Sequence, residues 1–295
     1  MHRFKIMRIH LVARPVSITM PIHKNNKPHG LLNLHRYKTR RFVLVAQQQT
    51  VFTHPSTKKT GSSALIVLHQ TGLSTYMMQQ IARTSQQSAT VFINVKYSTQ
   101  VLCPIRWFNQ SNEIKRCGHG TLAAALFLQQ YQGYYPHQFI SLSGEIFKIT
   151  YKLKQLRLSM AQIASKEVTP HKAVVKAINS TVLRSYTSAE EGGYTTVILD
   201  DSQPLSTRSI LTKPILSAPT ALIVLQKDSK TQQWYFRYFA PYYGIDEDQA
   251  TGSAVSIIAP IIKQLTTQNK GVIIQASKNG ARLNYHLTCQ SVLLY

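Results

Sequence analysis

The chain has 295 residues, 43% of them hydrophobic, which is enough apolar material for folded cores and excludes global disorder. Its three cysteines (Cys103, Cys117 and Cys289) form neither a disulfide framework nor a zinc-binding spacing, so we expect a reducing, cytoplasmic compartment. No apolar run approaches the length of a transmembrane helix, and a soluble protein is expected.

The formal net charge is +23, and all eleven acidic residues lie at Glu113 or later. A basic balance is compatible with binding to nucleic acid or an anionic membrane, and equally with a host whose whole proteome is basic. The basic residues are scattered through predicted strands and loops instead of forming one stripe. We therefore expect no nucleic-acid partner and no membrane partner.

Residues 1–42 differ in composition from the rest of the chain. They are rich in His, Arg and Lys, contain three prolines and show no sustained periodicity. A basic, acid-free leader has this composition, but the apolar region and cleavage site of a secretory signal are missing. We predict a weakly ordered extension, or a start codon assigned too early.

The first half after this extension alternates strand and helix patterns. Ser74 is predicted to cap a helix whose apolar face carries Met77, Met78, Ile81 and Ala82. A second helix, over 121–130, is apolar almost all round and should be central and buried. The predicted strands are 42–46, 50–52, 64–68, 91–95, 105–108, 139–142, 146–151 and 156–160.

The second half repeats this order around a helix over 254–263, which contains Pro260 and is predicted to kink there. The predicted strands are 195–199, 221–226, 234–239, 272–276, 282–287 and 292–294. We predict an α+β fold of two similar lobes, 43–165 and 166–295. Each lobe is expected to be a curved, mostly antiparallel, barrel-like sheet around a central helix.

One local pattern occurs in both lobes, about half a chain apart. It consists of Arg-aromatic-Phe, then an acidic residue, then a small-residue segment that opens the central helix. The two copies are RWF at 106–108, Glu113 and CGHGT at 117–121, and RYF at 237–239, Glu247 and ATGSA at 250–254. Interdomain clefts are common small-molecule sites and helix N-termini favour anions, so the repeat predicts one cleft site between the lobes.

The segment 117–121 carries the clearest chemistry. Cys117 and His119 lie where a helix dipole would lower the pKa of a thiol and favour an anionic ligand. The structural alternative is a helix start that needs glycine for its geometry, next to a buried cysteine. In the second copy, Asp248 could orient His119 or shuttle a proton, or it could simply stabilise the helix start, as we expect for Glu247.

Several motifs, in the right order from about residue 50 to 294, resemble the phenazine-biosynthesis (PhzF-like) isomerase family, within the diaminopimelate epimerase and proline racemase fold. They are VFT at 51–53, MQQIAR at 78–83, RWF at 106–108, CGH at 117–119, RYFAP at 237–241, ED at 247–248 and ATGSA at 250–254. The resemblance implies a biosynthetic, cofactor-independent isomerase with no metal. Its partner would be a small carboxylated metabolite, and the resemblance admits a homodimer.

The resemblance also implies roles for single residues. His119 and Asp248 would manage protons, and Cys117 stands at the position of a racemase cysteine. The second racemase cysteine has no counterpart near 249–250, which excludes a two-thiol mechanism. The residues that would hold the substrate carboxylate are Gly118, Gly120, Thr121, Thr251, Gly252 and Ser253.

The chain departs from the family at its main catalytic group. The family's base is the glutamate of a Ser-Glu-Thr motif, and here the triplet reads Ser88-Ala89-Thr90. The family's Gly-Asn-Pro is likewise altered, to Gly61-Ser62-Ser63. Three explanations stay open. Another group such as Cys117 serves as base, the protein binds a small carboxylate without turning it over, or this lineage has drifted from the family's chemistry.

Overall fold

The computed structural model describes residues 6–10, 41–53, 60–70, 72–188 and 193–295. Its first elements are β1 (Ile6–His10), β2 (Arg41–Val51), β3 (Ser62–His69), α1 (Thr75–Ser85), β4 (Ala89–Asn94), β5 (Leu102–Pro104), β6 (Arg106–Phe108), β7 (Glu113–Ile114), α2 (Gly118–Gln132), β8 (Gln138–Ile140), β9 (Ile146–Lys152) and β10 (Gln155–Ala161). The later strands are β11 (Ser165–Glu167), β12 (Val182–Ser188), β13 (Tyr194–Leu199), β14 (Ala221–Lys227), β15 (Trp234–Ala240), β16 (Ile245–Asp248), β17 (Lys270–Gln275), β18 (Ala281–Leu287) and β19 (Ser291–Leu294). The later helices are α3 (Lys172–Ile178), α4 (Val255–Thr266) and the 3₁₀ turns η2 (Leu205–Thr207), η3 (Lys213–Ile215), η4 (Pro241–Tyr243) and η5 (Gly252–Ala254).

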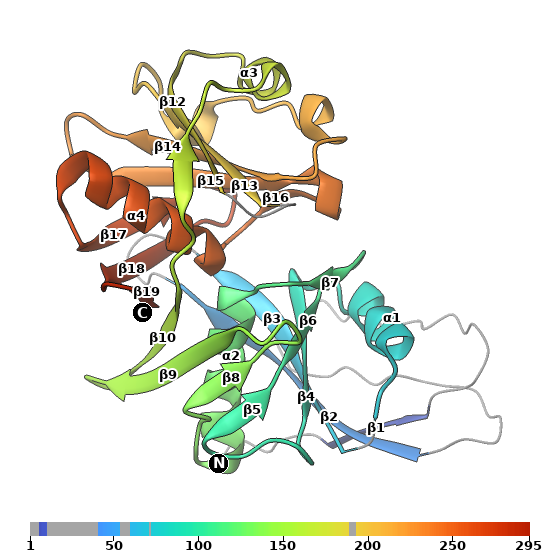
Figure 1. The fold of residues 1–295 in the computed structure, drawn as a ribbon. Helices are drawn as coiled ribbons and strands as arrows, with labels where there is room; N and C mark the ends of the chain where they lie inside the picture. Colours follow the sequence, from blue (N-terminus) through green and yellow to red (C-terminus); the bar gives the residue numbers. More distant parts are fainter. Residues whose placement is uncertain (1–5, 11–40, 54–59, 71, 189–192) are drawn as a thin grey trace.

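The described strands form two sheets. The smaller has the order β1-β2-β3-β4-β6-β7. The larger has the order β11-β12-β13-β14-β15-β17-β18-β19-β10-β9-β8-β5, with β16 paired to β15. Most neighbours are antiparallel, as predicted. The larger sheet crosses from one lobe to the other because C-terminal β19 pairs with β10, with Leu294 opposite Leu158. Figure 1 shows this junction between the lower, blue-green lobe and the upper, yellow-red lobe.

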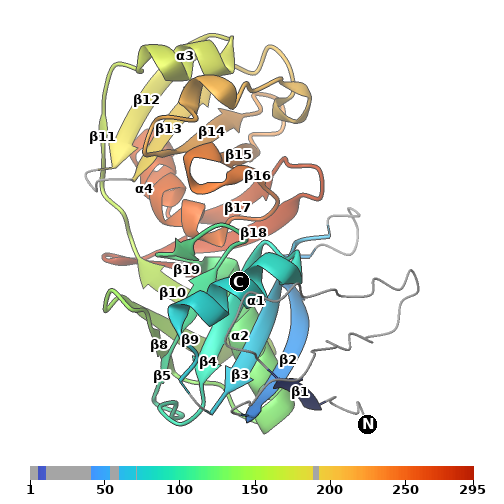
Figure 2. The ribbon, with the colours of Figure 1, turned by 90° about the vertical axis from the view of Figure 1, so that its right-hand side faces the viewer.

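The first lobe is a layered structure in which α1 and α2 cover opposite faces of β3 and β4. On one face, Met78, Ile81 and Ala82 of α1 pack against Val67 and Phe92. On the other face, α2 packs with residues from both lobes in one large core. Figure 2 shows α1 on the outside of the sheet and the second lobe stacked above. The buried α2 confirms the expectation from its nearly uniform apolar composition.

The helix boundaries have local causes. Ser74 caps α1, and its hydroxyl accepts a hydrogen bond from the amide of Met77 at 3.2 Å, as predicted. Helix α2 starts three residues earlier than predicted and ends at Gly133, whose φ of +78° is a conformation that favours glycine. In the second lobe, η5 precedes α4, and the chain stays helical through Pro260.

Some elements differ from the sequence-based expectations. The apolar runs at 42–46 and 50–52 lie in one strand, β2, except for Phe52, which follows its last residue. Residues 6–10 form β1, which pairs with β2 inside the extension predicted to be weakly ordered. The rest of that extension up to residue 40 lies outside the described residues. The short helix α3 was not predicted.

The repeated Arg-aromatic-Phe pattern has a structural role in both lobes. In the first, the Arg106 guanidinium forms two hydrogen bonds of 2.7 Å to the Glu113 carboxylate. In the second, Arg237 makes the equivalent pair of bonds to Glu247, at 2.7 and 2.8 Å. Each arginine lies on a strand whose antiparallel neighbour supplies the glutamate. Glu247 therefore has a structural role, but it acts by pairing with Arg237 on the neighbouring strand and not by stabilising the helix start, as the sequence had suggested.

A buried arginine beside α2 joins several elements. The Arg116 side chain, only 9% exposed, pairs with Glu145 in the β8–β9 turn. It also donates to the Ala161 carbonyl at 2.7 Å and to the Ser256 hydroxyl at 3.1 Å. Because it contacts both β10 and α4, it links the two lobes next to Cys117.

Replacing Glu145 with alanine is expected to lower the free energy of unfolding by about 1–3 kcal/mol, because the largely buried Arg116 charge loses its acidic partner. The measurement is a urea unfolding midpoint. The matched control is Glu167→Ala, whose partner Arg184 is 3.5 Å away and about half exposed. That change should leave the midpoint nearly unchanged, because exposed ion pairs contribute little. Equal shifts in the two variants would contradict this account.

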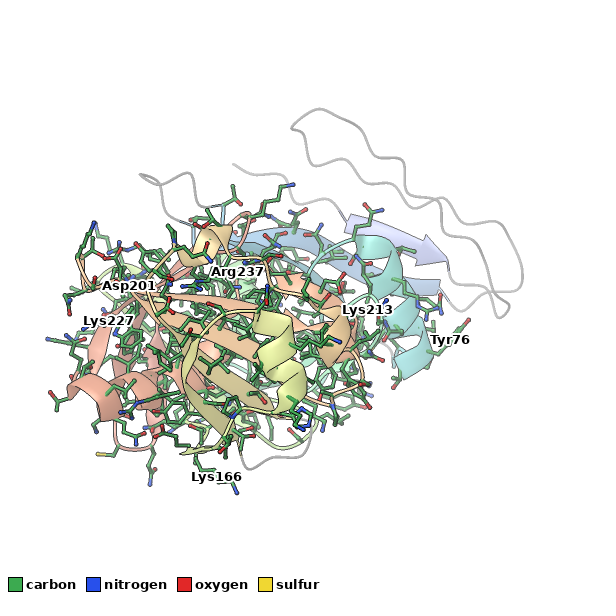
Figure 3. The ribbon with its side chains drawn as sticks, turned by 90° about the horizontal axis from the view of Figure 1, so that it is seen from above. Tyr76, Lys166, Asp201, Lys213, Lys227 and Arg237 are labelled. Atoms are coloured by element: carbon green, nitrogen blue, oxygen red, sulfur yellow. The ribbon has the colours of Figure 1, made fainter. Side chains whose placement is uncertain are left out.

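The lysines of the second lobe are spread over several elements of its surface. In Figure 3, which looks down on this lobe, Lys166, Lys213 and Lys227 lie on different sides of the molecule. In the part of the chain that the structure describes, no helix is long and apolar enough to cross a membrane.

Candidate active site

The helix starts of the two lobes meet directly. A Cβ atom placed on Gly118, at the start of α2, would lie 3.1 Å from the backbone nitrogen of Ser253 in η5. A Cβ on Gly252 would lie 3.1 Å from the ring of Phe52. Both glycines are therefore needed for close approach between the lobes. His119 and Ser253, separated by 134 positions in the sequence, lie in adjoining segments, as the two-lobe hypothesis requires.

Gly118→Ala is expected to force these helix starts apart, because the added methyl also meets the Gly252 carbonyl carbon at 3.2 Å. Both obstacles are backbone atoms that cannot rotate away, and overpacking of this kind costs about 1–3 kcal/mol. Thermal unfolding of the variant measures the effect. Gly72→Ala is the matched control, since a Cβ there has nothing within 4 Å. An unchanged melting temperature for Gly118→Ala would contradict the close contact.

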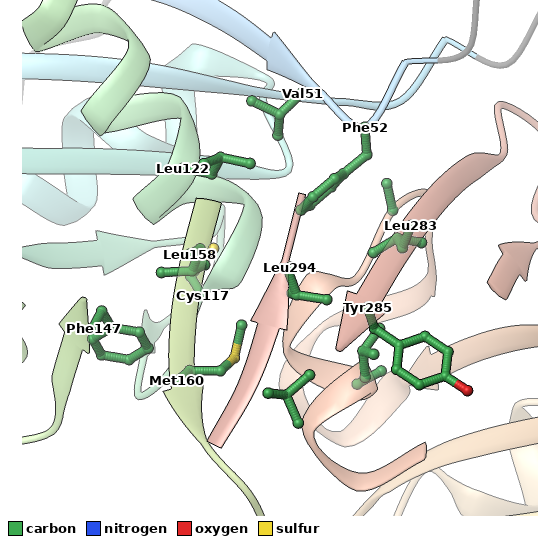
Figure 4. Close-up of a cluster of buried hydrophobic side chains, with 14 of the residues drawn as sticks. Val51, Phe52, Cys117, Leu122, Phe147, Leu158, Met160, Leu283, Tyr285 and Leu294 are labelled. Carbon is green, nitrogen blue, oxygen red and sulfur yellow. The ribbon is translucent and has the colours of Figure 1, made fainter. Parts of the chain in front are cut away.

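The residues named from the sequence are gathered here and shielded from solvent. The exposed fractions are 4% for Cys117, 5% for His119 and 8% for Asp248. Buried with them are Gly118, Gly120, Thr121, Thr251, Gly252 and Ser253. Figure 4 shows Cys117 beside Leu158 and Met160 of the first lobe, with Leu294 and Leu283 of the second lobe facing them. The polar site therefore lies against an apolar interlobe core.

His119 has hydrogen-bond partners on both ring nitrogens. Its Nε2 lies 3.2 Å from the Ser88 hydroxyl. Its Nδ1 lies 3.6 Å from the Cys117 sulfur, which is also 3.9 Å from Nε2. The hydrogen bonds of the imidazole thus run to Ser88 and Cys117. The sequence had suggested Asp248 as the residue that could orient the ring.

The expectation that the helix dipole activates Cys117 is wrong for this structure. Burial raises the pKa of the Cys117 thiol to about 12, and the nearby negative charge of Asp248 adds to the rise. A hydrogen bond with the backbone of Gly120 acts in the opposite direction but is weaker. At neutral pH the group is therefore a neutral thiol, which is neither a thiolate nucleophile nor a strong base.

His119 is neutral at the same pH. Burial lowers the pKa of its imidazole, and the charge of Asp248 opposes that shift without reversing it. A neutral imidazole has one free lone pair and can accept a proton. Of the two residues in the CGH motif, the histidine is thus the one in a protonation state suited to take a proton at neutral pH.

Asp248 is held by the second lobe. Its carboxylate accepts a hydrogen bond of 2.6 Å from the Thr251 hydroxyl, and the buried Gln275 side chain binds the Asp248 carbonyl and the Thr251 amide at 2.5 and 2.6 Å. Tyr238 lies opposite Asp248 in the β15–β16 pair. The pKa of Tyr238 is raised well above its usual value, chiefly by burial, with smaller contributions from Tyr194 and Asp248. Gln275 and Tyr238 were not among the site residues found in the sequence, because only chain folding brings them to Asp248.

The departures from the family pattern lie together in space. Ala89 is fully buried at the start of β4, directly opposite Ala64 of β3. Next to it, the Ser88 hydroxyl lies 2.8 Å from that of Ser62, and Ser63 donates to the Gln87 side chain at 2.5 Å. Hydroxyl and amide groups therefore form a hydrogen-bonded cluster beside Ala89, the position at which the sequence resemblance led us to expect a carboxylate.

Comparisons with known proteins agree with this architecture. The family model described as phenazine biosynthesis-like protein (PhzC-PhzF) matches residues 50–285. A phenazine biosynthesis-like domain-containing protein of Bos taurus is 27% identical over 250 residues, covering 77% of this chain and 86% of the relative. An uncharacterized isomerase of Halalkalibacterium halodurans is 25% identical over 249 residues, covering 82% of this chain and 91% of its own length.

Among solved structures, a PhzF-family protein from Enterococcus faecalis superposes with a TM-score of 0.71 at 22% sequence identity. The superposition covers 86% of this chain and 93% of that protein. At this identity the likeness shows the fold alone, and it confirms the two-lobed α+β architecture expected from the sequence.

Proposed function

Because the chain belongs to the phenazine biosynthesis-like (PhzC-PhzF) family of isomerases and epimerases, we propose that it is an isomerase that moves a proton on a small carboxylated metabolite. The observation that carries the proposal is the meeting of the two helix starts around His119. No organic cofactor or metal is part of the proposed reaction.

The helix starts supply the binding half of the proposal. The first amides of a helix have no partner inside the helix, and the helix dipole places partial positive charge at that end. Amides from 118–120 and 252–253 would hold the substrate carboxylate between the lobes, whereas the amides of Thr121 and Ala254 already donate to the carbonyls of Cys117 and Thr251. Such preorganised donors also stabilise the negative charge that develops when a proton leaves the neighbouring carbon.

His119 supplies the chemical half. Its neutral imidazole would take the proton from carbon and return it at another position, so that the C–H bond breaks as an N–H bond forms. The charge of Asp248 acts to raise the pKa of His119, which favours the imidazolium once the proton has arrived. The burial-raised pKa of Cys117 supports the view that the thiol is not the base.

The experiment is deuterium wash-in from D₂O at the acidic carbon of a panel of small 2-hydroxy and 2-amino carboxylates. Exchange by the natural protein that survives Cys117→Ala would support His119 as the base. Exchange that disappears in Cys117→Ala would instead assign that role to the thiol. Binding of a carboxylate without exchange in any variant would favour the second candidate, a silent carboxylate-binding protein, which the alanine at position 89 suggests.

The pH dependence of the exchange rate is a second, independent way to distinguish His119 from Cys117 as the base. The lowered pKa of His119 means that its neutral form already prevails at neutral pH, so the exchange rate should be flat above pH 7. It should fall at acidic pH, as the imidazole becomes protonated. A thiolate base would behave differently, because a thiol pKa of about 12 requires the rate to rise about tenfold per pH unit from neutral pH up to that value. A rate that climbs steadily with pH would contradict the assignment to His119.

A further inference from the structure

The hydroxyl of Ser88 lies within hydrogen-bond distance of three groups. It is 3.0 Å from the Ser63 carbonyl oxygen, 2.8 Å from the Ser62 hydroxyl and 3.2 Å from His119 Nε2. A serine hydroxyl has one hydrogen to donate and two lone pairs that accept. These contacts therefore restrict where each hydrogen can lie.

The Ser63 carbonyl determines which group donates in each of these hydrogen bonds. A carbonyl oxygen only accepts, so the single hydrogen of Ser88 points to Ser63. The Ser88 oxygen then accepts from its other two neighbours, and it receives one hydrogen from Ser62 and one from His119 Nε2. This arrangement satisfies all three contacts at once.

This direction of the hydrogen bonds determines which nitrogen of the His119 ring carries the hydrogen. A neutral imidazole carries one N–H, and if Nε2 holds it, then Nδ1 has the free lone pair. The remaining partner of the ring agrees with this, because the Cys117 thiol can donate to Nδ1 at 3.6 Å. That contact is long and sulfur is a weak donor, so a substrate can replace it at little cost.

We propose that Ser88, supported by Ser62 and the Ser63 carbonyl, is a positioning residue that holds His119 with its hydrogen on Nε2 and makes Nδ1 the atom that accepts the substrate proton. The catalytic consequence rests on the proposed function, whereas the tautomer itself is measurable without any substrate. Failure of either can therefore be told apart.

The primary test is the ¹⁵N NMR spectrum of the His119 ring in the full chain above pH 7, with His119→Asn used to assign the signals. The natural protein is expected to show a protonated Nε2 and an unprotonated Nδ1. A protonated Nδ1, or an equal mixture of tautomers, overturns the proposal. This measurement needs no variant of the serine cluster, so it does not depend on how such variants fold.

Variants of the serines then test whether Ser88 is what sets the tautomer of His119. Ser88→Ala should shift the tautomer balance towards Nδ1–H, and Ser88→Thr, which keeps the hydroxyl, should restore Nε2–H. Ser63→Ala is the matched control, because it removes the hydroxyl bonded to Gln87 but keeps the backbone carbonyl that receives the Ser88 hydrogen. A folded Ser88→Ala protein that keeps the natural tautomer refutes the role of Ser88.

The activity readout follows the same series. If a substrate from the carboxylate panel exchanges, Ser88→Ala should lower the rate by at least about tenfold with little change in KM, because a misplaced ring hydrogen removes the accepting lone pair. Ser88→Thr, which keeps the hydroxyl, should recover most of the natural rate. Equal losses in Ser88→Ala and Ser88→Thr would mean that the hydroxyl does not position His119, and would overturn the proposal.

Discussion

Replacing His119 with asparagine is expected to lower deuterium exchange into a carboxylate substrate by about 10²–10⁴-fold, the usual contribution of a general base. Asparagine is close in size and still forms hydrogen bonds, but its amide has no useful basicity. The rate is measured by wash-in of solvent deuterium at saturating substrate. Thermal unfolding of the variant shows whether the fold is retained, since Ser88 and Cys117 both lose a partner.

The matched control is His171→Asn. His171 lies at the start of α3, where its ring accepts a hydrogen bond from the Ala173 amide, and asparagine is also a good helix cap. This change should leave exchange at the natural rate. If His119→Asn exchanges as fast as the control, His119 is not the base, and the neutral imidazole serves binding alone.

The second large effect is expected from introducing a carboxylate at position 89, where the sequence resemblance led us to expect one. Ala89→Glu should raise the exchange rate by up to about 10²-fold, because it adds a basic group directly after Ser88, which contacts His119. The same change places a longer side chain at a fully buried position opposite Ala64, so it is also expected to lower the melting temperature. Exchange and thermal unfolding are measured on the same preparation.

Ala89→Gln provides the control, since it has the size of glutamate without its basicity. Both variants should lose stability, and only the glutamate should gain exchange. If the two variants exchange equally, the gain does not come from a carboxylate base. If the Ala89→Glu variant is folded and binds a carboxylate but shows no exchange, the surrounding site does not support proton transfer. That result would favour the second candidate function, a silent carboxylate-binding protein.

The sequence alone determined the three long helices and many of the strands, in their order along the chain. The capped helix after Ser74 and the buried helix after Cys117 follow from side-chain periodicity and from residues that act within one turn of the chain. The repeat of Arg-aromatic-Phe and a later glutamate also predicted two related lobes. These features are readable because their causes lie within a few residues of one another.

The sequence did not predict that the larger sheet extends through both lobes. The pairing of β10 with β19 joins residues about 130 positions apart, and nothing in either strand specifies the other. The sequence predicted one curved sheet per lobe, and only the folded chain shows that a single sheet passes through both. Strand partners at this separation are chosen by packing of the whole core.

The candidate site, too, was predictable from the sequence only in part. The motifs predicted which residues would gather at the helix starts, and the resemblance singled out Ala89 as a position where a glutamate was expected. The state of those residues was decided by the tertiary structure, because burial between the lobes raises the pKa of Cys117 and lowers that of His119. The partners Ser88, just before β4, and Gln275, at the end of β17, likewise come from segments distant in the sequence. A protonation state depends on everything that excludes water from a group, and that is a property of the assembled core and not of any local pattern.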